Sequence, residues 1–121
     1  MNEVRPPVDY IMSKPVYSVK QNHDVGQAYK IMKTHGTKKI LVKGKDDKPI
    51  GVLESWKITS KDYDRKIKDM PLGKIELMPE DTDIDAVEAA LSIVSAVYLT
   101  DRKNSNQING VVTAYDLYKA V

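Results

Sequence analysis

The chain ends with the stretch Gly110-Val111-Val112-Thr113-Ala114-Tyr115-Asp116-Leu117-Tyr118-Lys119-Ala120-Val121, which carries the signals that decide the fold. A short apolar run predicts a buried strand, and a helix is expected to begin at Thr113 with Asp116 three residues into it. Backbone N–H groups at a helix start are unpaired and carry partial positive charge, which suits a phosphate. The Thr113 hydroxyl and the Asp116 carboxylate are therefore candidates to bind the phosphate and sugar of a nucleotide.

The same residues also fit a purely structural role. Thr-x-x-Asp matches a capping box, in which the Thr113 side chain caps the helix and the Asp116 side chain reaches back to the first backbone N–H. The first half of the chain offers a similar cap, since Ser55 follows an apolar strand there. Both interpretations remain open from the sequence.

Length and composition describe one small globular domain. The chain has 121 residues, of which 41% are hydrophobic and 30% charged, and it contains no cysteine. Disulfides and thiol chemistry are excluded, and zinc sites are disfavoured. The sequence has no apolar run of bilayer length and no apolar signal core near Met1, so we expect a cytoplasmic protein without membrane contact.

Charge is unevenly distributed along the chain. Residues 1–60 contain 11 Lys/Arg and 6 Asp/Glu, a balance of +5, whereas residues 61–121 contain 8 and 11, a balance of −3. This asymmetry indicates either attraction between the halves or an anionic ligand near the first half. A solvated lysine surface explains it equally well.

Hydrophobic periodicity predicts alternating short elements. Helices or helical turns are expected at 8–12, 25–35, 55–58, 67–70, 84–91 and 113–121. Strands are expected at 16–19, 39–42, 50–53, 74–77, 96–99 and 108–112. Polar segments at 45–49 and 101–107 are expected to be turns.

These elements form an internal repeat. Gly51-Val52-Leu53 recurs as Gly110-Val111-Val112 after 59 residues, and Asp9-Tyr10-Ile11-Met12 recurs loosely as Ile67-Lys68-Asp69-Met70. The predicted organisation is an N-terminal tail at 1–7, a first repeat at 8–60, a linker at 61–65 and a second repeat at 66–121. Units this small bury little apolar surface alone. We therefore expect a mixed α+β fold of two strand-helix-strand-strand-helix repeats, packed sheet to sheet with pseudo-twofold symmetry.

Over residues 8–121 the chain resembles a tandem pair of CBS domains (cystathionine-β-synthase domains), also called a Bateman module. The residues that carry the resemblance in the first half are Asp9 to Ser13, Val16 to Val19, Ala28, Met32, Ile40 to Val42 and Gly51 to Leu53. In the second half they are Lys68 to Met70, Ile75 to Leu77 and Gly110 to Leu117.

The resemblance implies binding of an adenine nucleotide (AMP, ADP or ATP) or an adenosyl compound in a cleft between the repeats. Gly110, Thr113 and Asp116 match the family's ligand motif, in which the acidic residue holds the ribose hydroxyls, and Val111 lies within that motif. The implied adenine pocket is lined by Ser13, Tyr17, Ser18, Thr37, Lys38 and Lys39. Lys38 and Lys39 depart from the small residues common there, so their side chains obstruct the base, reach a phosphate, or lie in solvent.

A second cleft implied by the same symmetry is degenerate. Glu54 replaces the Thr113 position and Lys57 replaces the Asp116 position, and an ammonium group cannot accept ribose hydroxyl protons. The remaining residues assigned to this cleft are Leu72, Ile75, Val94, Ser95 and Ala96. We expect one competent nucleotide site per chain.

Other chemistry is not indicated by the sequence. His23 and His35 are separated in the pattern, and no Cys/His/Asp cluster has metal-ligand spacing. Asp81, Asp83 and Asp85 alternate but lack the Gly and Glu of a calcium loop, and they are better explained as charges at a helix start. No pair of nucleophile and base is evident, so we expect no enzyme activity and no required cofactor.

The sequence thus favours a regulatory module that senses an adenine nucleotide, forms a homodimer and acts on an unknown protein. One alternative is a module for self-association that binds no ligand, suggested by the degenerate first repeat. A third, less favoured interpretation is nucleic-acid binding through the basic first half, which would weaken steeply with salt.

Overall fold

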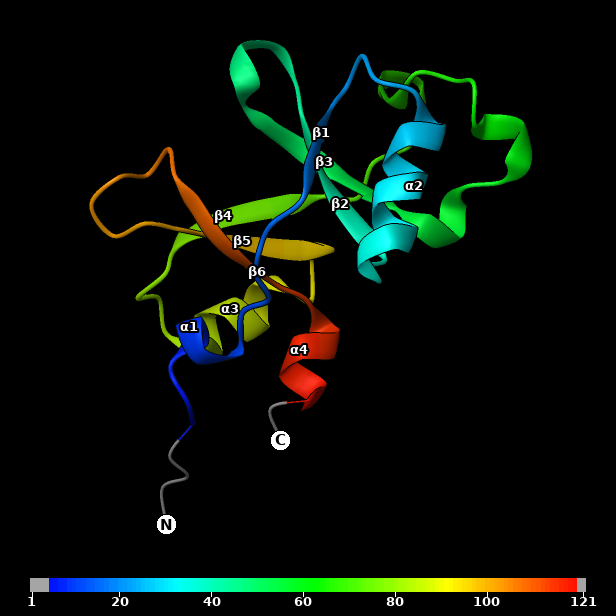
Figure 1. Cartoon of the computed structure of the whole chain (residues 1–121). Coiled ribbons are helices and arrows are strands. Elements are labelled where there is room, and N and C mark those ends of the chain that lie inside the picture. The colour runs from blue at the N-terminus through cyan, green and yellow to red at the C-terminus, as the bar shows by residue number, and fades with distance from the viewer. Residues whose placement is uncertain (1–4, 120–121) are drawn as a thin grey trace. The chain divides into compact units, whose positions relative to one another are not determined.

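The computed structural model describes residues 5–119, which form two compact units, each built on a three-stranded sheet (Figure 1). Unit 1 combines the chain up to Val16 with the chain from Ile75 onward, and unit 2 is Tyr17–Lys74. The first four residues of the predicted tail and the last two of the predicted C-terminal helix lie outside the described residues. The fold is the mixed α+β fold expected from the sequence, with two short sheets and few helices.

Unit 2 contains β1 (Ser18–Lys20), α2 (Val25–His35), β2 (Lys39–Lys43) and β3 (Pro49–Glu54). The sheet order is β1-β2-β3, with β1 parallel to β2 and β2 antiparallel to β3. Short 3₁₀ turns occupy Lys45–Asp47, Ser55–Lys57, Ser60–Asp62 and Ile67–Asp69. Buried residues from α2, all three strands and the last turn form one apolar cluster.

Helix α2 begins and ends where the sequence predicts. At its start, Asp24 and Gln27 form a capping box, which satisfies two otherwise unpaired backbone donors. At its end, Gly36 adopts φ 66°, a left-handed conformation that glycine reaches without steric penalty. Val25, Ala28 and Met32 lie on one face and are buried, which fixes the helix against the sheet.

Unit 1 contains α1 (Val8–Ile11), β4 (Ile75–Pro79), α3 (Ile84–Ala90), β5 (Ala96–Thr100), β6 (Ile108–Val112) and α4 (Ala114–Lys119). The sheet order is β4-β5-β6, with the same parallel and antiparallel pairing as in unit 2. Val8 of α1 and Val87 of α3 pack with buried residues of β5 and β6 in a second apolar cluster. Figure 1 shows α1 beside α3 in this unit.

The loop between β5 and β6 is organised by one side chain. The Asp101 carboxylate accepts hydrogen bonds from the backbone N–H groups of Lys103 (3.0 Å) and Asn104 (3.1 Å). These bonds favour the charged carboxylate, so the Lys103 N–H in particular lowers the pKa of Asp101 below its usual value. The predicted polar turn at 101–107 is therefore an ordered hairpin loop.

The compact units do not coincide with the two sequence repeats. Residues 8–16 pack with the sheet of the second repeat, and residues 66–74 pack with the sheet of the first. Each connecting segment forms an antiparallel bridge with the last strand of its sheet, Ser13 with Val111 in unit 1 and Gly73 with Val52 in unit 2. The chain before each repeat's first strand thus completes the other unit.

Three local predictions differ from the structure. The helix expected at 55–58 is a single 3₁₀ turn, Ser55–Lys57, after which Ile58 is extended. The strand expected at 16–19 is Ser18–Lys20, because only these residues align with β2. The segment predicted as a linker is not free of contacts, since the Tyr63 and Arg65 carbonyls accept hydrogen bonds from the Gly26 and Val25 N–H groups of α2.

Candidate functional site

The candidate site in unit 1 begins with the segment Met12–Lys14, which we call the strap because it lies along β6. Ser13 N–H donates to Val111 O (2.8 Å), and Val111 N–H donates to Ser13 O (3.1 Å). A Cβ atom placed on Gly110 would lie 3.0 Å from Met12 Cβ and 2.7 Å from Met12 Cγ, and would overlap Met12 Sδ. A methyl group at position 110 would therefore force the Met12 side chain of the strap to shift.

Asp116 is held by hydrogen bonds to both of its carboxylate oxygens. Ser13 Oγ donates to Asp116 Oδ1 (2.8 Å), and the Thr113 backbone N–H donates to Asp116 Oδ2 (2.8 Å). The Thr113 hydroxyl lies 3.3 Å from the same Oδ2 atom. The carboxylate is buried, with 5% of the residue exposed. These contacts fix both oxygens relative to β6 and the strap.

The capping interpretation of Thr-x-x-Asp is confirmed in one respect, because Asp116 reaches back to the Thr113 N–H at the start of α4. This N–H is consequently occupied and is not available to a phosphate. The phosphate role suggested for this helix start stays a prediction for the groups other than this N–H. The Ser13 contact is additional, since it joins the helix to a residue 103 positions earlier in the chain.

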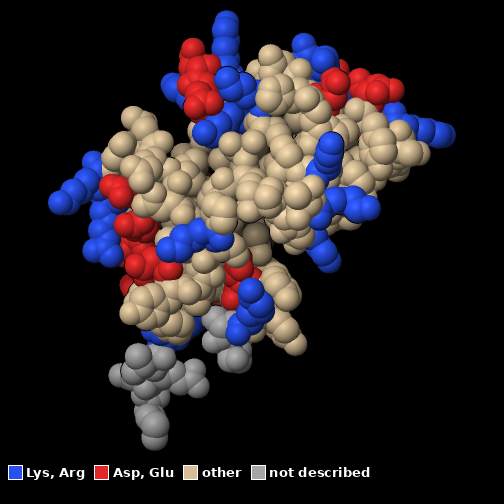
Figure 2. Space-filling view, viewed as in Figure 1, with Lys and Arg blue, Asp and Glu red and all other residues tan. Residues whose placement is uncertain are grey.

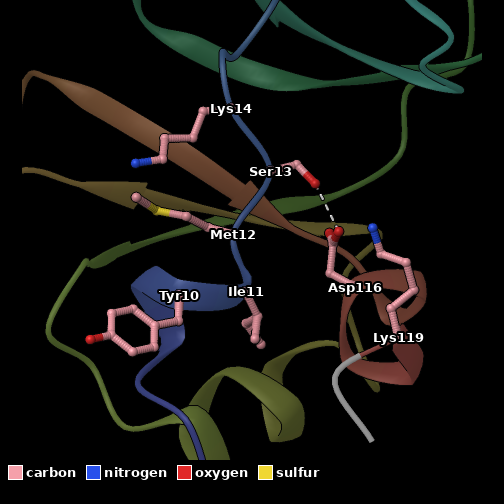
Figure 3. A pocket seen from close by; sticks show the side chains of 7 residues that line it. All are labelled: Tyr10, Ile11, Met12, Ser13, Lys14, Asp116 and Lys119. Carbon is pink, nitrogen blue, oxygen red and sulfur yellow. Dashed lines mark hydrogen bonds between the residues drawn. The ribbon is translucent and has the colours of Figure 1, made fainter.

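Asp116 also lines an open hollow of about 530 Å³ in unit 1 (Figure 3). The volume lies within the range of small-molecule sites, roughly 300–1,000 Å³. The other lining residues are Tyr10, Ile11, Met12, Ser13, Lys14 and Lys119. In Figure 3 the Lys119 ammonium lies beside the Asp116 carboxylate, and the Lys14 side chain extends to the other side of the strap.

The equivalent positions in unit 2 have the same backbone arrangement with different chemistry. A Cβ atom on Gly51 would lie 2.9 Å from Leu72 Cβ and 3.0 Å from the Gly73 carbonyl oxygen, so Pro71 to Gly73 forms a second strap over β3. Glu54 is buried and accepts a salt bridge from Lys57 Nζ at 3.1 Å. The Glu54 carboxylate thus forms an ion pair within its own turn.

The first half of the chain matches a known protein family, and the whole chain matches solved structures. A family model described as the CBS domain matches residues 8–62, whereas no curated protein sequence matches significantly. A hemolysin-like CBS protein from Oenococcus oeni PSU superposes with a TM-score of 0.79 at 18% identity, over 96% of this chain and 90% of that one. The chain folds as a tandem pair of CBS domains.

Two further CBS structures also superpose on nearly all of this chain. The CBS domain pair of protein MJ0100, solved with 5′-methylthioadenosine and S-adenosyl-L-methionine, has a TM-score of 0.75 at 25% identity, covering 96% of this chain and 95% of that one. A CBS protein of unknown function from Thermoplasma acidophilum, TA0289, gives 0.75 at 24% identity, with 98% and 70% covered. The resemblance to a tandem CBS pair is thus confirmed at the level of the fold.

The site residues predicted for the CBS pair divide between the two units. Ser13, Val111, Thr113 and Asp116 come together in unit 1, although Val111 contributes through its backbone and only Ser13 and Asp116 line the hollow. Glu54, Lys57 and Leu72 of the degenerate cleft come together in unit 2. The other residues of that cleft lie in unit 1 at the start of β4 and of β5: Ile75, Val94, Ser95 and Ala96.

Apart from Ser13, which lies in unit 1, the residues predicted to line the adenine pocket share one end of the unit 2 sheet. The Tyr17 ring stacks on His35, with centroids 4.1 Å apart, and Thr37 Oγ1 donates to the Lys39 carbonyl (3.0 Å). Ser18 begins β1, and the Lys38 carbonyl accepts a bond from the Ser55 N–H. Lys39 Nζ lies 5.5 Å from the centre of the Trp56 ring, so its ammonium group is drawn toward that aromatic face.

Five residues that line the hollow were not predicted from the sequence: Tyr10, Ile11, Met12, Lys14 and Lys119. Helical spacing contains the signal for Lys119, because residues three apart share one face of a helix. The other four belong to α1 and the strap. Their neighbour, the helix carrying Asp116, is about a hundred residues away in sequence, and no local pattern indicates that contact.

The net charges of the two units differ more than the net charges of the two halves of the sequence. Residues 17–74 contain 14 Lys/Arg and 7 Asp/Glu, a balance of +7, whereas residues 1–16 and 75–121 contain 5 and 10, a balance of −5. On the face shown in Figure 2, basic side chains are dispersed among acidic and neutral ones. That face has no continuous basic stripe of the kind that binds a nucleic-acid backbone.

Within residues 5–119, no three His, Asp or Glu side chains are grouped in a way that could hold a metal ion. The longest helix of that part is α2, with 11 residues, and no helix there has the length and apolar character needed to cross a bilayer.

Proposed function

We propose that this CBS pair is a regulatory module that binds an adenosine-containing ligand through the Asp116 carboxylate. The observation that supports the proposal is a buried carboxylate, fixed by two hydrogen bonds, in the wall of a hollow of suitable volume. The MJ0100 domain pair was solved with two adenosine-containing ligands, and both carry the vicinal ribose hydroxyls that a carboxylate accepts well.

The hydrogen-bonding capacity of Asp116 is compatible with a sugar. An ionised carboxylate offers about four acceptor positions, and the bonds from Ser13 and Thr113 use two of them. The free positions can accept a ribose hydroxyl, and a second hydroxyl can replace the Ser13 donor. Binding would then shift the population of conformations that a partner protein reads. The base-reading role of Tyr17, Ser18, Thr37, Lys38 and Lys39 stays a prediction.

Thermal melting with separate additions of AMP, ADP, ATP and S-adenosylmethionine tests the proposal. A ligand that binds only the folded state raises the melting temperature, by an amount that grows with its concentration above Kd. At least one compound is expected to raise it in a concentration-dependent way, whereas guanosine monophosphate serves as a control for the base. If the four adenosine compounds leave the melting temperature unchanged at millimolar concentration, the proposal fails.

Replacing Ser13 with Ala is expected to affect binding and stability in opposite directions. The variant loses the bond to Asp116 Oδ1, which lowers the free energy of unfolding by roughly 1 kcal/mol. The same change leaves Oδ1 open to the ligand, so we expect nucleotide affinity to rise about three- to tenfold, as removal of one competing hydrogen bond allows. Titration calorimetry and urea unfolding measure the two effects. Weaker binding would instead make Ser13 a direct ligand contact.

Self-association is a second candidate function, favoured by exposed aromatic side chains on α4. Tyr115 and Tyr118 are 66% and 78% exposed and lie three residues apart, on one side of the helix. A second copy of the chain would cover these rings, and the homodimer remains a proposal. Sedimentation analysis of the wild type and of a Tyr118→Ser variant tests it. A wild type that is monomeric at high micromolar concentration would contradict this candidate.

A further inference from the structure

We infer that Lys119 makes the hollow selective for anionic adenosine ligands, those carrying phosphate, over neutral or cationic adenosyl compounds. The inference rests on the proposed function, since it concerns the ligand held at Asp116. It also goes beyond that function, because a sugar-binding carboxylate alone does not distinguish AMP from S-adenosylmethionine. The feature that distinguishes them is the charge around the hollow.

Lys119 is placed to act on a ligand because, within residues 5–119, its ammonium group forms no ion pair. Among residues 5–119, no carboxylate lies within ion-pair distance of Lys119 Nζ, whose described contact is the Tyr115 ring at 5.1 Å. Asp116 is its neighbour on the same helix face, yet no ion pair joins the two side chains, and the Asp116 oxygens accept hydrogen bonds from Ser13 and Thr113. The positive charge of Lys119 is therefore available at the wall of the hollow.

The overall charge of the hollow supports the same conclusion. Its ionisable lining at pH 7, apart from the neutral Tyr10, consists of Asp116, Lys14 and Lys119, a balance of +1. Asp116 and Lys119 lie three residues apart on one face of α4, so a phosphate attached to a sugar on Asp116 can come near the Lys119 ammonium group. The lysine charge attracts a phosphate, whereas it repels S-adenosylmethionine overall, because the sulfonium and ammonium groups of that compound outweigh its one carboxylate.

Calorimetric titration of adenosine, AMP, ADP and S-adenosylmethionine tests this selectivity at low salt, since the site is exposed and screened by salt. The wild type is expected to bind AMP about three- to tenfold more tightly than adenosine, the range for one exposed charge interaction. In Lys119→Ala this ratio is expected to fall to near one, with adenosine affinity unchanged. Lys103→Ala removes an exposed lysine of the 101–107 loop, outside the hollow, and is expected to keep the wild-type ratio.

The outcomes separate the inference from the proposed function. A wild type that binds adenosine but prefers S-adenosylmethionine to AMP would overturn the inference and leave the proposed function intact, as would an unchanged AMP-to-adenosine ratio in Lys119→Ala. If no adenosine compound binds, the proposed function fails, and tripolyphosphate alone still tests the anion site. The anion site is supported if Lys119→Ala binds tripolyphosphate more weakly than the wild type while Lys103→Ala binds it equally well. Equal binding by the wild type and both variants would overturn the site.

Discussion

Asp116→Ala is expected to abolish adenosine-ligand binding, with a loss of at least about a hundredfold in affinity. Two hydrogen bonds from sugar hydroxyls to a charged acceptor contribute roughly 3 kcal/mol or more, which corresponds to this factor. The variant also loses the bonds from the Thr113 N–H and the Ser13 hydroxyl, so the free energy of unfolding should fall by roughly 1–2 kcal/mol. Calorimetric titration well below the melting temperature measures binding to the folded protein.

Two variants separate the loss of the ligand from the loss of stability. Asp116→Asn keeps an oxygen for the Thr113 N–H and is expected to fold more stably than Asp116→Ala, while still losing most of the affinity. Lys57→Ala changes the equivalent position of unit 2 and leaves the buried Glu54 carboxylate without its partner, so it should also destabilise the protein. Its binding should match the wild type. Equal affinity losses in Lys57→Ala and Asp116→Ala would contradict a single competent site.

The second large effect is expected from adding one methyl group beneath either strap. Gly51→Ala places its Cβ against Leu72 Cβ and the Gly73 carbonyl oxygen, neither of which can move without shifting the strap backbone. Overpacking of this kind lowers the free energy of unfolding by roughly 1–3 kcal/mol. Gly110→Ala meets only Met12 atoms, and the outermost of them belong to a flexible side chain. Urea unfolding should therefore show the larger loss for Gly51→Ala.

Double variants further distinguish the two glycine positions, 51 and 110. Met12→Ala removes the Sδ and Cγ atoms that a residue 110 methyl would meet, so the pair Met12→Ala/Gly110→Ala should be about 1 kcal/mol more stable than the sum of its single effects predicts. Leu72→Ala leaves the Cβ contact and the Gly73 oxygen in place, so little coupling with Gly51→Ala is expected. Strong coupling at Gly51 and none at Gly110 would show that the straps do not constrain these glycines as described.

Sequence patterns predicted the regular elements well where local signals were complete. Helix α2 has a capping box at Asp24, a buried face and a left-handed glycine at Gly36, and its observed bounds match the prediction. Signals were weaker after β3, where Ser55 suggested a longer helix than the single 3₁₀ turn that forms. Nothing in the local sequence determines how far a short helix extends, because packing decides this.

The sequence indicated Asp116 as the central residue of the candidate site but did not indicate most of the residues around it. The spacing of Thr113 and Asp116 indicated both a cap and a ligand contact, and the structure contains the cap. Ser13 was expected near the base, yet its hydroxyl donates to Asp116. The recurrent glycines suggested a repeat, and the structure adds that they allow the straps to approach β3 and β6.

The sequence by itself determined the repeated pattern of strands and helices and the Thr-x-x-Asp cap that contains Asp116. These features depend on hydrophobic period, capping and spacing, which act over a few residues. Only the tertiary structure decided that the chain before each repeat completes the other unit, and that Met12–Lys14 and Lys119 line the hollow beside Asp116. In unit 1 such contacts join residues about a hundred positions apart, such as Ser13 and Val111, and in unit 2 they join residues such as Val52 and Gly73. They form because each small sheet must bury apolar surface that its own repeat leaves exposed.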